Sequence, residues 1–242
     1  MKKILLLALS LFAGVSAVWA ANPIVDNPNN KPYVGVRLNL ESNIPGNVNF
    51  SNTSVNAFNP GAGISVGAIY NRPIIANFYV EPGLELYYNT QKFNTEDDLF
   101  QNSQWEHNSV RSFGMRVPVM LGYHFDFSPK VSLAVATGPV LKVGFTEDYY
   151  LTTKTKVSDD VAFRNHYSGS LYKDSPFAMA GPENARNRVD CAWRFSIGVN
   201  FLKHYYAGLS GEVGMVNRIK HTNNGAYSQH DNLFQLNLGY NF

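Results

Sequence analysis

The sequence has a single cysteine, Cys191, among 242 residues, so the chain forms no internal disulfide bond. A metal site built on this thiol is not expected, because no His or other Cys stands near it at ligand spacing. Charged residues make up only 16% of the chain and the formal net charge is +2, which argues against nucleic acid as a partner. After the first twenty residues, no run of about 18 apolar residues remains, which excludes a transmembrane helix.

The first twenty residues have the three parts of a secretory signal peptide. Lys2 and Lys3 form a basic start, residues 4–12 form an apolar core, and Val18 and Ala20 are small residues at the −3 and −1 positions of a cleavage site. No Cys follows this site, so a lipid-anchored lipoprotein is not expected. We predict a signal peptide at 1–20, a periplasmic lead segment at 21–32 and one domain at 33–242.

The remaining chain is rich in segments that alternate apolar and polar residues, most clearly FQLNLGYNF at 234–242. Successive side chains of a strand point to opposite sides. The apolar side of this segment consists of Phe234, Leu236, Leu238, Tyr240 and Phe242. A strand that is apolar outside, polar inside and ends on an aromatic residue is typical of the closing strand of an outer-membrane β-barrel. We interpret the five residues as the C-terminal signal through which the barrel-assembly machinery recognises the chain.

Seven further segments alternate in the same way, at about 33–41, 61–71, 77–89, 110–125, 131–145, 188–201 and 205–216. Short links at 72–76, 126–129 and 202–204 alternate with long ones at 42–60, 90–109, 146–187 and 217–231. Short inner turns and long outer loops are typical of outer-membrane barrels. The sequence therefore predicts an all-β fold, an eight-stranded antiparallel up-and-down transmembrane β-barrel located in the cell outer membrane and surrounded by its lipid.

Aromatic residues of the apolar face cluster at the ends of these segments, as interfacial girdles require. Those near the short turns are Tyr70, Phe78, Tyr123, Phe125, Phe201, Tyr205, Tyr240 and Phe242, and those near the long loops are Tyr88, Phe113, Phe145 and Trp193. A soluble barrel or sandwich with an aromatic core is the alternative. The opposite face, rich in Gly, Ser and charges, suits a narrow lumen better than a soluble exterior. Pro82, Pro118 and Pro139 each remove a ladder donor, so we expect local bulges or bends there.

Four motifs, FYVEPGLEL at 78–86, MRVPVMLGY at 115–123, ATGPVL at 136–141 and LNLGYNF at 236–242, resemble the strand motifs of the PorT-like outer-membrane β-barrel family. That family is typical of Bacteroidota, and the resemblance spans most of the mature chain. It implies an eight-stranded barrel of the outer membrane. The motifs are specific for the barrel and not for an activity.

Six charged residues on the polar faces are expected to meet inside the barrel: Glu81, Glu85, Arg116, Lys142, Arg194 and Glu212. Counted from the turn at 202–204, Arg194 and Glu212 should be directly opposed. Glu85 and Arg116 should lie at one depth, with Glu81 below and Lys142 above. Because an eight-stranded barrel is just wide enough for side chains to fill it, we interpret the set as a structural network of ion pairs. A gated ion path or a small polar ligand site is the alternative.

Enzymatic chemistry is not expected from this sequence. The histidines, His107, His124, His166, His204, His221 and His230, fall in turns, at strand ends or beside long loops, and no G-x-S-x-G or HExxH motif is present. The nearest acid–base grouping is His230 and Asp231 beside Ser228. We predict no catalytic residue, no cofactor and no metal.

The connection at 146–187 is far longer than usual, which indicates either function or disorder. Residues 149–157 are expected to extend a hairpin above the membrane, whereas Tyr167, Tyr172, Phe177 and Met179 suit an adaptable contact surface or a cap over the lumen. The sequence thus favours a non-enzymatic structural or surface-interaction protein with a side-chain-filled lumen, whose partner is a surface or secretion-complex protein. The alternatives are a narrow porin, an accessory component of a transport or secretion assembly, and a lipid-modifying enzyme.

Overall fold

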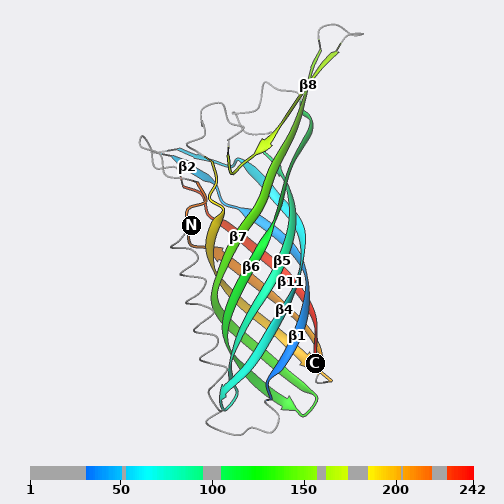
Figure 1. Cartoon of the computed structure of the whole chain (residues 1–242), viewed down its shortest axis with the longest axis vertical. Coiled ribbons are helices and arrows are strands. Elements are labelled where there is room, and N and C mark those ends of the chain that lie inside the picture. Colours follow the sequence, from blue (N-terminus) through cyan, green and yellow to red (C-terminus); the bar gives the residue numbers. More distant parts are fainter. Residues whose placement is uncertain are drawn as a thin grey trace.

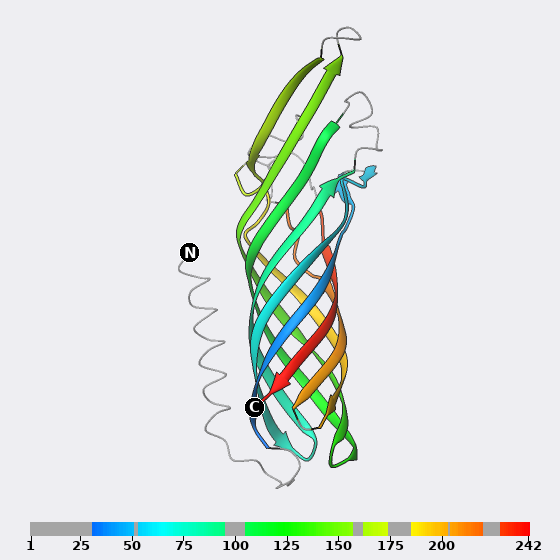
Figure 2. The ribbon, with the colours of Figure 1, turned by 90° about the vertical axis from the view of Figure 1, so that its right-hand side faces the viewer.

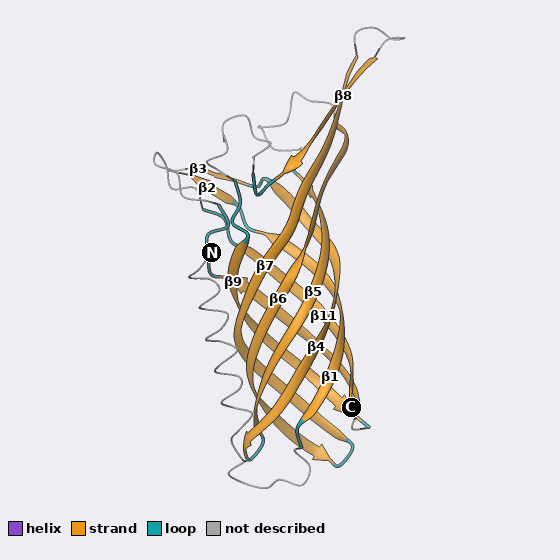
Figure 3. Cartoon of the chain, in the orientation of Figure 1, coloured by secondary structure: helices purple, strands orange, loops and turns teal. Residues whose placement is uncertain are grey.

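The computed structural model describes residues 31–50, 53–94, 105–156, 162–173, 185–202, 204–219 and 228–242. The predicted signal peptide, most of the lead segment, and His221, Phe177 and Met179 lie outside these residues. The described elements are strands joined by turns and loops (Figure 3). Across the described part of the chain, no helix is long and apolar enough to cross a membrane.

Eight antiparallel strands form a closed ring (Figures 1 and 2). Their bounds are β1 Tyr33–Pro45, β4 Phe58–Ile75, β5 Phe78–Phe93, β6 Trp105–Ser128, β7 Val131–Lys156, β9 Val189–Phe201, β10 Tyr205–Gly214 and β11 Asp231–Asn241. Each strand pairs with its neighbours in this order, and β11 returns to β1 with Leu238 opposite Leu38. The predicted eight-stranded barrel is therefore confirmed.

The connections alternate as predicted. Six of the eight strands run further than the sequence pattern indicated, whereas β9 and β10 are one and two residues shorter than predicted. The turns at one end contain only residues 76–77, 129–130 and 202–204, so the expected links at 72–76 and 126–129 are mostly strand. Ala76 and Leu202 have φ values of 48° and 52°, the left-handed conformation that such tight turns require. At the opposite end, β4, β6 and β7 continue well beyond the alternating segments because their upper parts still find neighbouring strands.

The burial pattern is the reverse of that of a soluble protein. Along β1, Leu38 and Leu40 are 45% and 52% exposed, whereas Asn39 between them is fully buried. The same alternation runs through β11, where Leu236 points outward and Gln235 is buried. A soluble barrel would bury its leucines, because burial of apolar surface drives folding in water. An outer face of leucine, valine and phenylalanine suits hydrocarbon instead.

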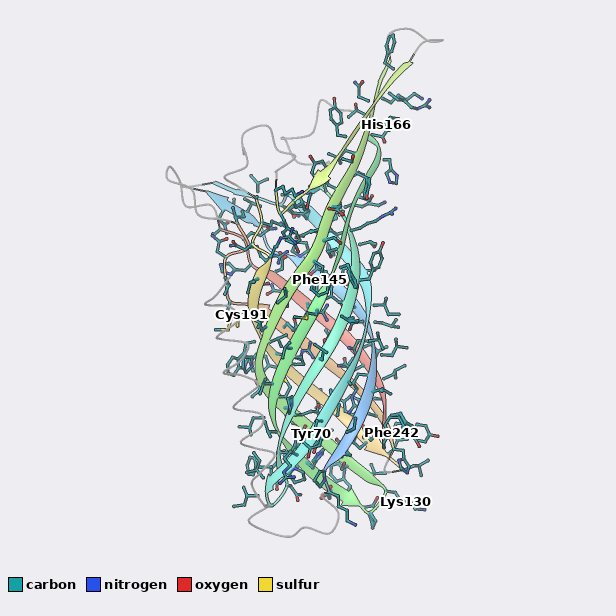
Figure 4. All side chains as sticks on the ribbon, in the orientation of Figure 1. Tyr70, Lys130, Phe145, His166, Cys191 and Phe242 are labelled. Atoms are coloured by element: carbon teal, nitrogen blue, oxygen red, sulfur yellow. The ribbon has the colours of Figure 1, made fainter. Side chains whose placement is uncertain are left out.

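Aromatic side chains border this apolar outer face at both ends. At the short-turn end, Phe201, Tyr205 and Tyr240 form a run with ring centroids 5.5 and 5.6 Å apart. At the long-loop end, Phe113 and Phe145 lie 5.4 Å apart (Phe145 is labelled in Figure 4). Phe78 and Tyr88 lie ten residues apart on β5, which spans about 25 Å at the usual rise and tilt of barrel strands. That height matches the apolar band of an outer-membrane barrel.

Pro82, Pro118 and Pro139 interrupt pairing without shifting the register, so the bulges expected at these three positions are wrong. The β5–β6 register is the same on both sides of the gap between Pro82 and Glu85, and the β7–β9 register runs unbroken through Pro139. Pro118 lies against Gly83, whose missing side chain leaves room for the proline ring. Register shifts occur elsewhere. One lies in the β6–β7 pairing, where Phe145 of β7 is an extra residue, and two lie in β4, next to Pro60 and Pro73.

At the long-loop end, β6 and β7 continue past the barrel and are joined by β8 (Ala162–Ser170) in a projecting sheet (Figure 2). The predicted extension of the hairpin at 149–157 is confirmed as far as Lys156. A short hairpin of β2 (Val48–Phe50) and β3 (Thr53–Val55) lies in the connection between β1 and β4. The base of the projecting sheet covers a small apolar core that includes Phe58, Phe93 and Tyr149.

Inward tyrosines lie flat over glycines of the neighbouring strand. A Cβ atom added to Gly122 would stand 2.3 Å from Cζ of Tyr79, its direct partner across β5 and β6. Gly211, on the outer face, has nothing closer than the Leu233 carbonyl oxygen at 3.9 Å. We expect Gly122→Ala to lower the free energy of unfolding by about 1–3 kcal/mol, because overpacking forces the ring to move. Gly211→Ala is the matched control and should leave it unchanged in urea titrations of the vesicle-inserted protein; equal losses in both variants would contradict the packing argument.

Candidate functional site

The middle of the lumen is crossed by charged side chains from strands on all sides of the ring. Arg194 on β9 stands directly opposite Glu212 on β10, and its Nε and Nη2 atoms donate to Glu212 Oε1 at 2.8 and 2.6 Å. Arg194 also donates through Nη1 and Nη2 to Glu85, at 2.6 and 2.9 Å. One guanidinium group therefore joins two carboxylates that lie on opposite walls.

The contacts continue in both directions to give a linear series of alternating charge: Glu41–Arg116–Glu85–Arg194–Glu212–Lys142. We call these six residues the central network. Arg116 donates to both oxygens of Glu41 at 2.6 and 2.5 Å and to Glu85 at 3.3 Å. Lys142 lies 2.9 Å from Glu212. The Arg116 side chain is 2% exposed and that of Glu212 is fully buried, and three positive charges balance three negative ones.

Five of the six charged residues singled out in the sequence meet in the central network. Glu81 does not: it lies nearer the short turns, where its carboxylate accepts a hydrogen bond from Asn71 at 3.0 Å. Lys142 stands level with Arg116, its direct partner across β6 and β7, and not above it. Glu41 was missed, although it has the same inward parity in β1 as Asn39, because it stood at the edge of the predicted segment.

A second set of ion pairs closes the long-loop end, and we call it the upper network. The carboxylate of Glu147 on β7 accepts hydrogen bonds from Arg186 and, at 2.8 Å, from Arg218. Arg218 also lies 3.2 Å from Asp231 on β11. Burial opposes the charged form of Arg218, but Glu147 and Asp231 raise its pKa well above the ordinary value. Arg186 further donates to Gln229 at 2.8 Å, so two loop segments are fastened across the mouth.

The sequence pattern could not have predicted the upper network. Phe113 and Gly114 of β6 pair with Thr146 and Gly144 of β7, so Phe145 is an extra residue that forms a bulge in β7 and reverses its inward parity beyond that point. Glu147 therefore points inward, although an unbroken alternation from Lys142 would turn it outward. Arg186 and Arg218 lie outside the strands, where no periodicity indicates direction.

The short-turn end is filled mainly by tyrosine, asparagine and histidine. Arg37 donates to Asn241 at 2.8 Å and lies over the ring of Tyr206, 4.3 Å from its centroid. Tyr79 stacks on His124 with ring centroids 4.2 Å apart. Below them, a hollow open to the short-turn side is lined by Lys31, His124, Asp126, Lys130 and His204, among others. Three layers of contacts therefore follow one another along the barrel axis.

The described histidines do not assemble a catalytic group with Ser, Asp or Glu. His107 and His166 lie on the projecting sheet (His166 is labelled in Figure 4), and His204 Nδ1 donates to the Asn241 carbonyl oxygen at 2.8 Å. The carboxylate of Asp231 faces Arg218, so His230 is not oriented by it. Among the residues described, no three His, Cys, Asp or Glu side chains are grouped as a metal site would require.

A family model described as the outer membrane protein beta-barrel domain matches residues 4–242. No curated protein matches the sequence. Among solved structures, the chain is similar to Ail, the attachment invasion locus protein of Yersinia pestis (10% identity, 88% of this chain and 99% of that one, TM-score 0.38). It is also similar to OprG of Pseudomonas aeruginosa (8%, 88% and 97%, TM-score 0.46) and to Neisserial surface protein A (9%, 86% and 97%, TM-score 0.38). The match over almost the whole chain shows that this protein belongs to the outer-membrane β-barrel domain family.

Proposed function

We propose that this integral β-barrel of the outer membrane has its long-loop end at the cell surface and is sealed and non-enzymatic. In this role the barrel holds the projecting β6–β7–β8 sheet above the membrane as a contact surface. The observation that carries the proposal is the central network. A series of six buried charges, paired from wall to wall, occupies the cross-section through which any solute would have to pass.

The cost of separating buried ion pairs supports a central network that stays in place and closes the lumen, more than one that opens as a gate. Moving one member of a buried ion pair aside leaves its partner unpaired, which costs about 3–5 kcal/mol. Tyr87 adds to the packing, since its ring lies 4.5 Å from the guanidinium carbon of Arg116. Arg194 makes four hydrogen bonds to two carboxylates, and a guanidinium group in this geometry has few alternative positions.

The sequence supports four more specific proposals: the branch of the family, recognition during assembly, the partner and the export signal. The PG, VP and GP positions at 82–83, 117–118 and 138–139 support placement in the PorT-like branch of the family. The unbroken alternation of β11 supports recognition of this strand by the barrel-assembly machinery. The projecting sheet supports a surface protein, or a subunit of a secretion complex, as the physiological partner. The start of the sequence supports export through a signal peptide at 1–20.

Conductance across a planar lipid bilayer tests the sealed barrel. The purified protein should show no steady open level, because the central network leaves no continuous water path. A porin of known conductance, inserted in the same bilayer, is the positive control, and protease protection of the barrel in vesicles verifies insertion. A steady single-channel level from the inserted wild-type protein would overturn the proposal and favour a narrow porin.

A further inference from the structure

Four strands present basic side chains on one outward face, which begins just beyond the long-loop aromatic band and extends up the projecting sheet. Lys154 on β7 stands directly opposite Arg164 on β8. Arg111 on β6 is exposed and pairs with Thr90 on β5, and Lys92 lies two residues further along the same side of β5. We call the group formed by Lys92, Arg111, Lys154 and Arg164 the basic face.

Other side chains of this face are suited to hydrogen bonding with an anion. Arg111 lies over the ring of Tyr150, 5.2 Å from its centroid, and the hydroxyl of Thr152 lies 3.0 Å from His166 Nδ1. Two acidic residues lie in the same part of the described strands, Asp148 opposite Arg111 and Glu106 beside His107 on β6. The acidic residues at 96–98 and 159–160 belong to the connections at the strand tips, outside the described residues. The described part of the face therefore carries a clear positive excess.

The position of the basic face along β6 and β7 shows how far it lies beyond the apolar band of the membrane. Phe113 belongs to the aromatic band, and Arg111 lies two residues before it in β6, about 7 Å nearer the long-loop end. Lys154 stands eight residues beyond Thr146, the partner of Phe113, which is about 26 Å along β7. The face is also continuous with the lipid-facing side of the barrel wall, because directly paired residues share a face. It thus points sideways, at the level of the lipid headgroups and the sugars attached to them, and not toward the mouth of the lumen.

We propose that the basic face binds the phosphate groups of a phosphorylated glycolipid in the outer leaflet. Arginine presents a planar fork that matches phosphate geometry, and lysine adds a point charge. Basic residues just outside the hydrocarbon are attracted to anionic headgroups, and each contributes separately to binding. A soluble polyanion could reach the mouth from any direction and would not require a face that continues the lipid-exposed wall. The inference goes beyond the sealed-barrel proposal, because it concerns the outside of the wall and is independent of conduction.

Titration of the detergent-solubilised full-length protein with lipid A tests the inference. The probes are bis-phosphorylated lipid A and its dephosphorylated form, and binding is measured by native mass spectrometry. The wild-type protein should retain the phosphorylated form preferentially. Arg111→Gln with Lys154→Gln should weaken binding at least tenfold, since two attractive charges are removed. Lys31→Gln with Lys130→Gln removes the same charge at the short-turn end and should bind as the wild type does.

Both double variants change residues outside the apolar band, and their folding is checked by heat-dependent gel mobility. Equal binding of the two lipid A forms would overturn the inference, as would equal losses in the two double variants. Tight binding of a heparin fragment, lost in the Arg111 and Lys154 variant while lipid A binding stays unchanged, would also overturn it and assign the face to a soluble polyanion. Loss of lipid A binding has no bearing on conductance, so failure here is distinguishable from failure of the sealed barrel.

Discussion

Replacement of Arg194 with methionine is expected to lower the free energy of unfolding by about 3–5 kcal/mol, the cost of an uncompensated buried charge. The side chain makes four hydrogen bonds to Glu85 and Glu212 and is 6% exposed. Without it, three carboxylates in the lumen face only two cations. Urea titration of the protein inserted in lipid vesicles, followed by tryptophan fluorescence, measures the loss.

A second substitution should restore much of the stability. Arg194→Met combined with Glu85→Met leaves two complete ion pairs, Glu41 with Arg116 and Glu212 with Lys142. Apolar replacement of a whole buried ion pair is often neutral, so the double variant should be more stable than Arg194→Met alone. Lys130→Met, in an exposed turn, is the control and should change stability by less than about 0.5 kcal/mol. A double variant less stable than the single one would show that the series does not act as paired charges.

Leu236→Arg is expected to lower the free energy of unfolding by about 2–4 kcal/mol, because the substitution places a charge at the middle of the apolar band. Leu236 lies halfway along β11, is 41% exposed on the outer face and is flanked by Leu40 and Leu209 on the adjacent strands. The measurement is the same urea titration in vesicles. If water or a second protein layer covered this face, the arginine would be tolerated.

The control for Leu236→Arg is Val34→Arg. Val34 is 50% exposed on the same outer face but lies at the short-turn end, opposite Tyr70. In transmembrane β-barrels, a charge near the membrane–water interface lowers the free energy of unfolding by only about 0–1 kcal/mol. Equal costs at the two positions would contradict hydrocarbon contact. A Leu236→Arg protein that refolds in vesicles like the wild type but fails to assemble in cells would assign β11 to recognition by the assembly machinery and not to lipid contact.

The alternation of apolar and polar residues was sufficient to predict the eight-stranded barrel and most of the side chains that point into its lumen. The opposition of Arg194 and Glu212 followed from counting along two strands from one turn, because the period of a strand is two and the β9–β10 register has no shift. Counting residues along a strand gave the wrong inward parity wherever the register shifts. The β6–β7 bulge reversed the parity of Glu147, and only the paired backbone shows this.

Other features depend on contacts that a pattern does not encode. Arg186 and Arg218 lie in loops, so their meeting at Glu147 follows from the closed mouth and not from any spacing in the sequence. The bulges expected at Pro82, Pro118 and Pro139 were wrong because a missing donor need not add a residue: Gly83 makes room for Pro118 and the register stays intact. Lys154 and Arg164 share a face with Lys92 and Arg111 because β8 folds back on β7, and no spacing in the sequence indicates this pairing.

The members of the central network come from β1, β5, β6, β7, β9 and β10, the first and nearly the last strands among them. An open, partly inserted sheet would leave several of these charges in hydrocarbon without their counterions, an intermediate of very high free energy. Partial insertion is therefore strongly disfavoured, and the membrane should admit the hairpins together or not at all. The residues that fill the finished barrel thus also make its insertion cooperative, because their charges raise the free energy of every state in which the barrel is not closed.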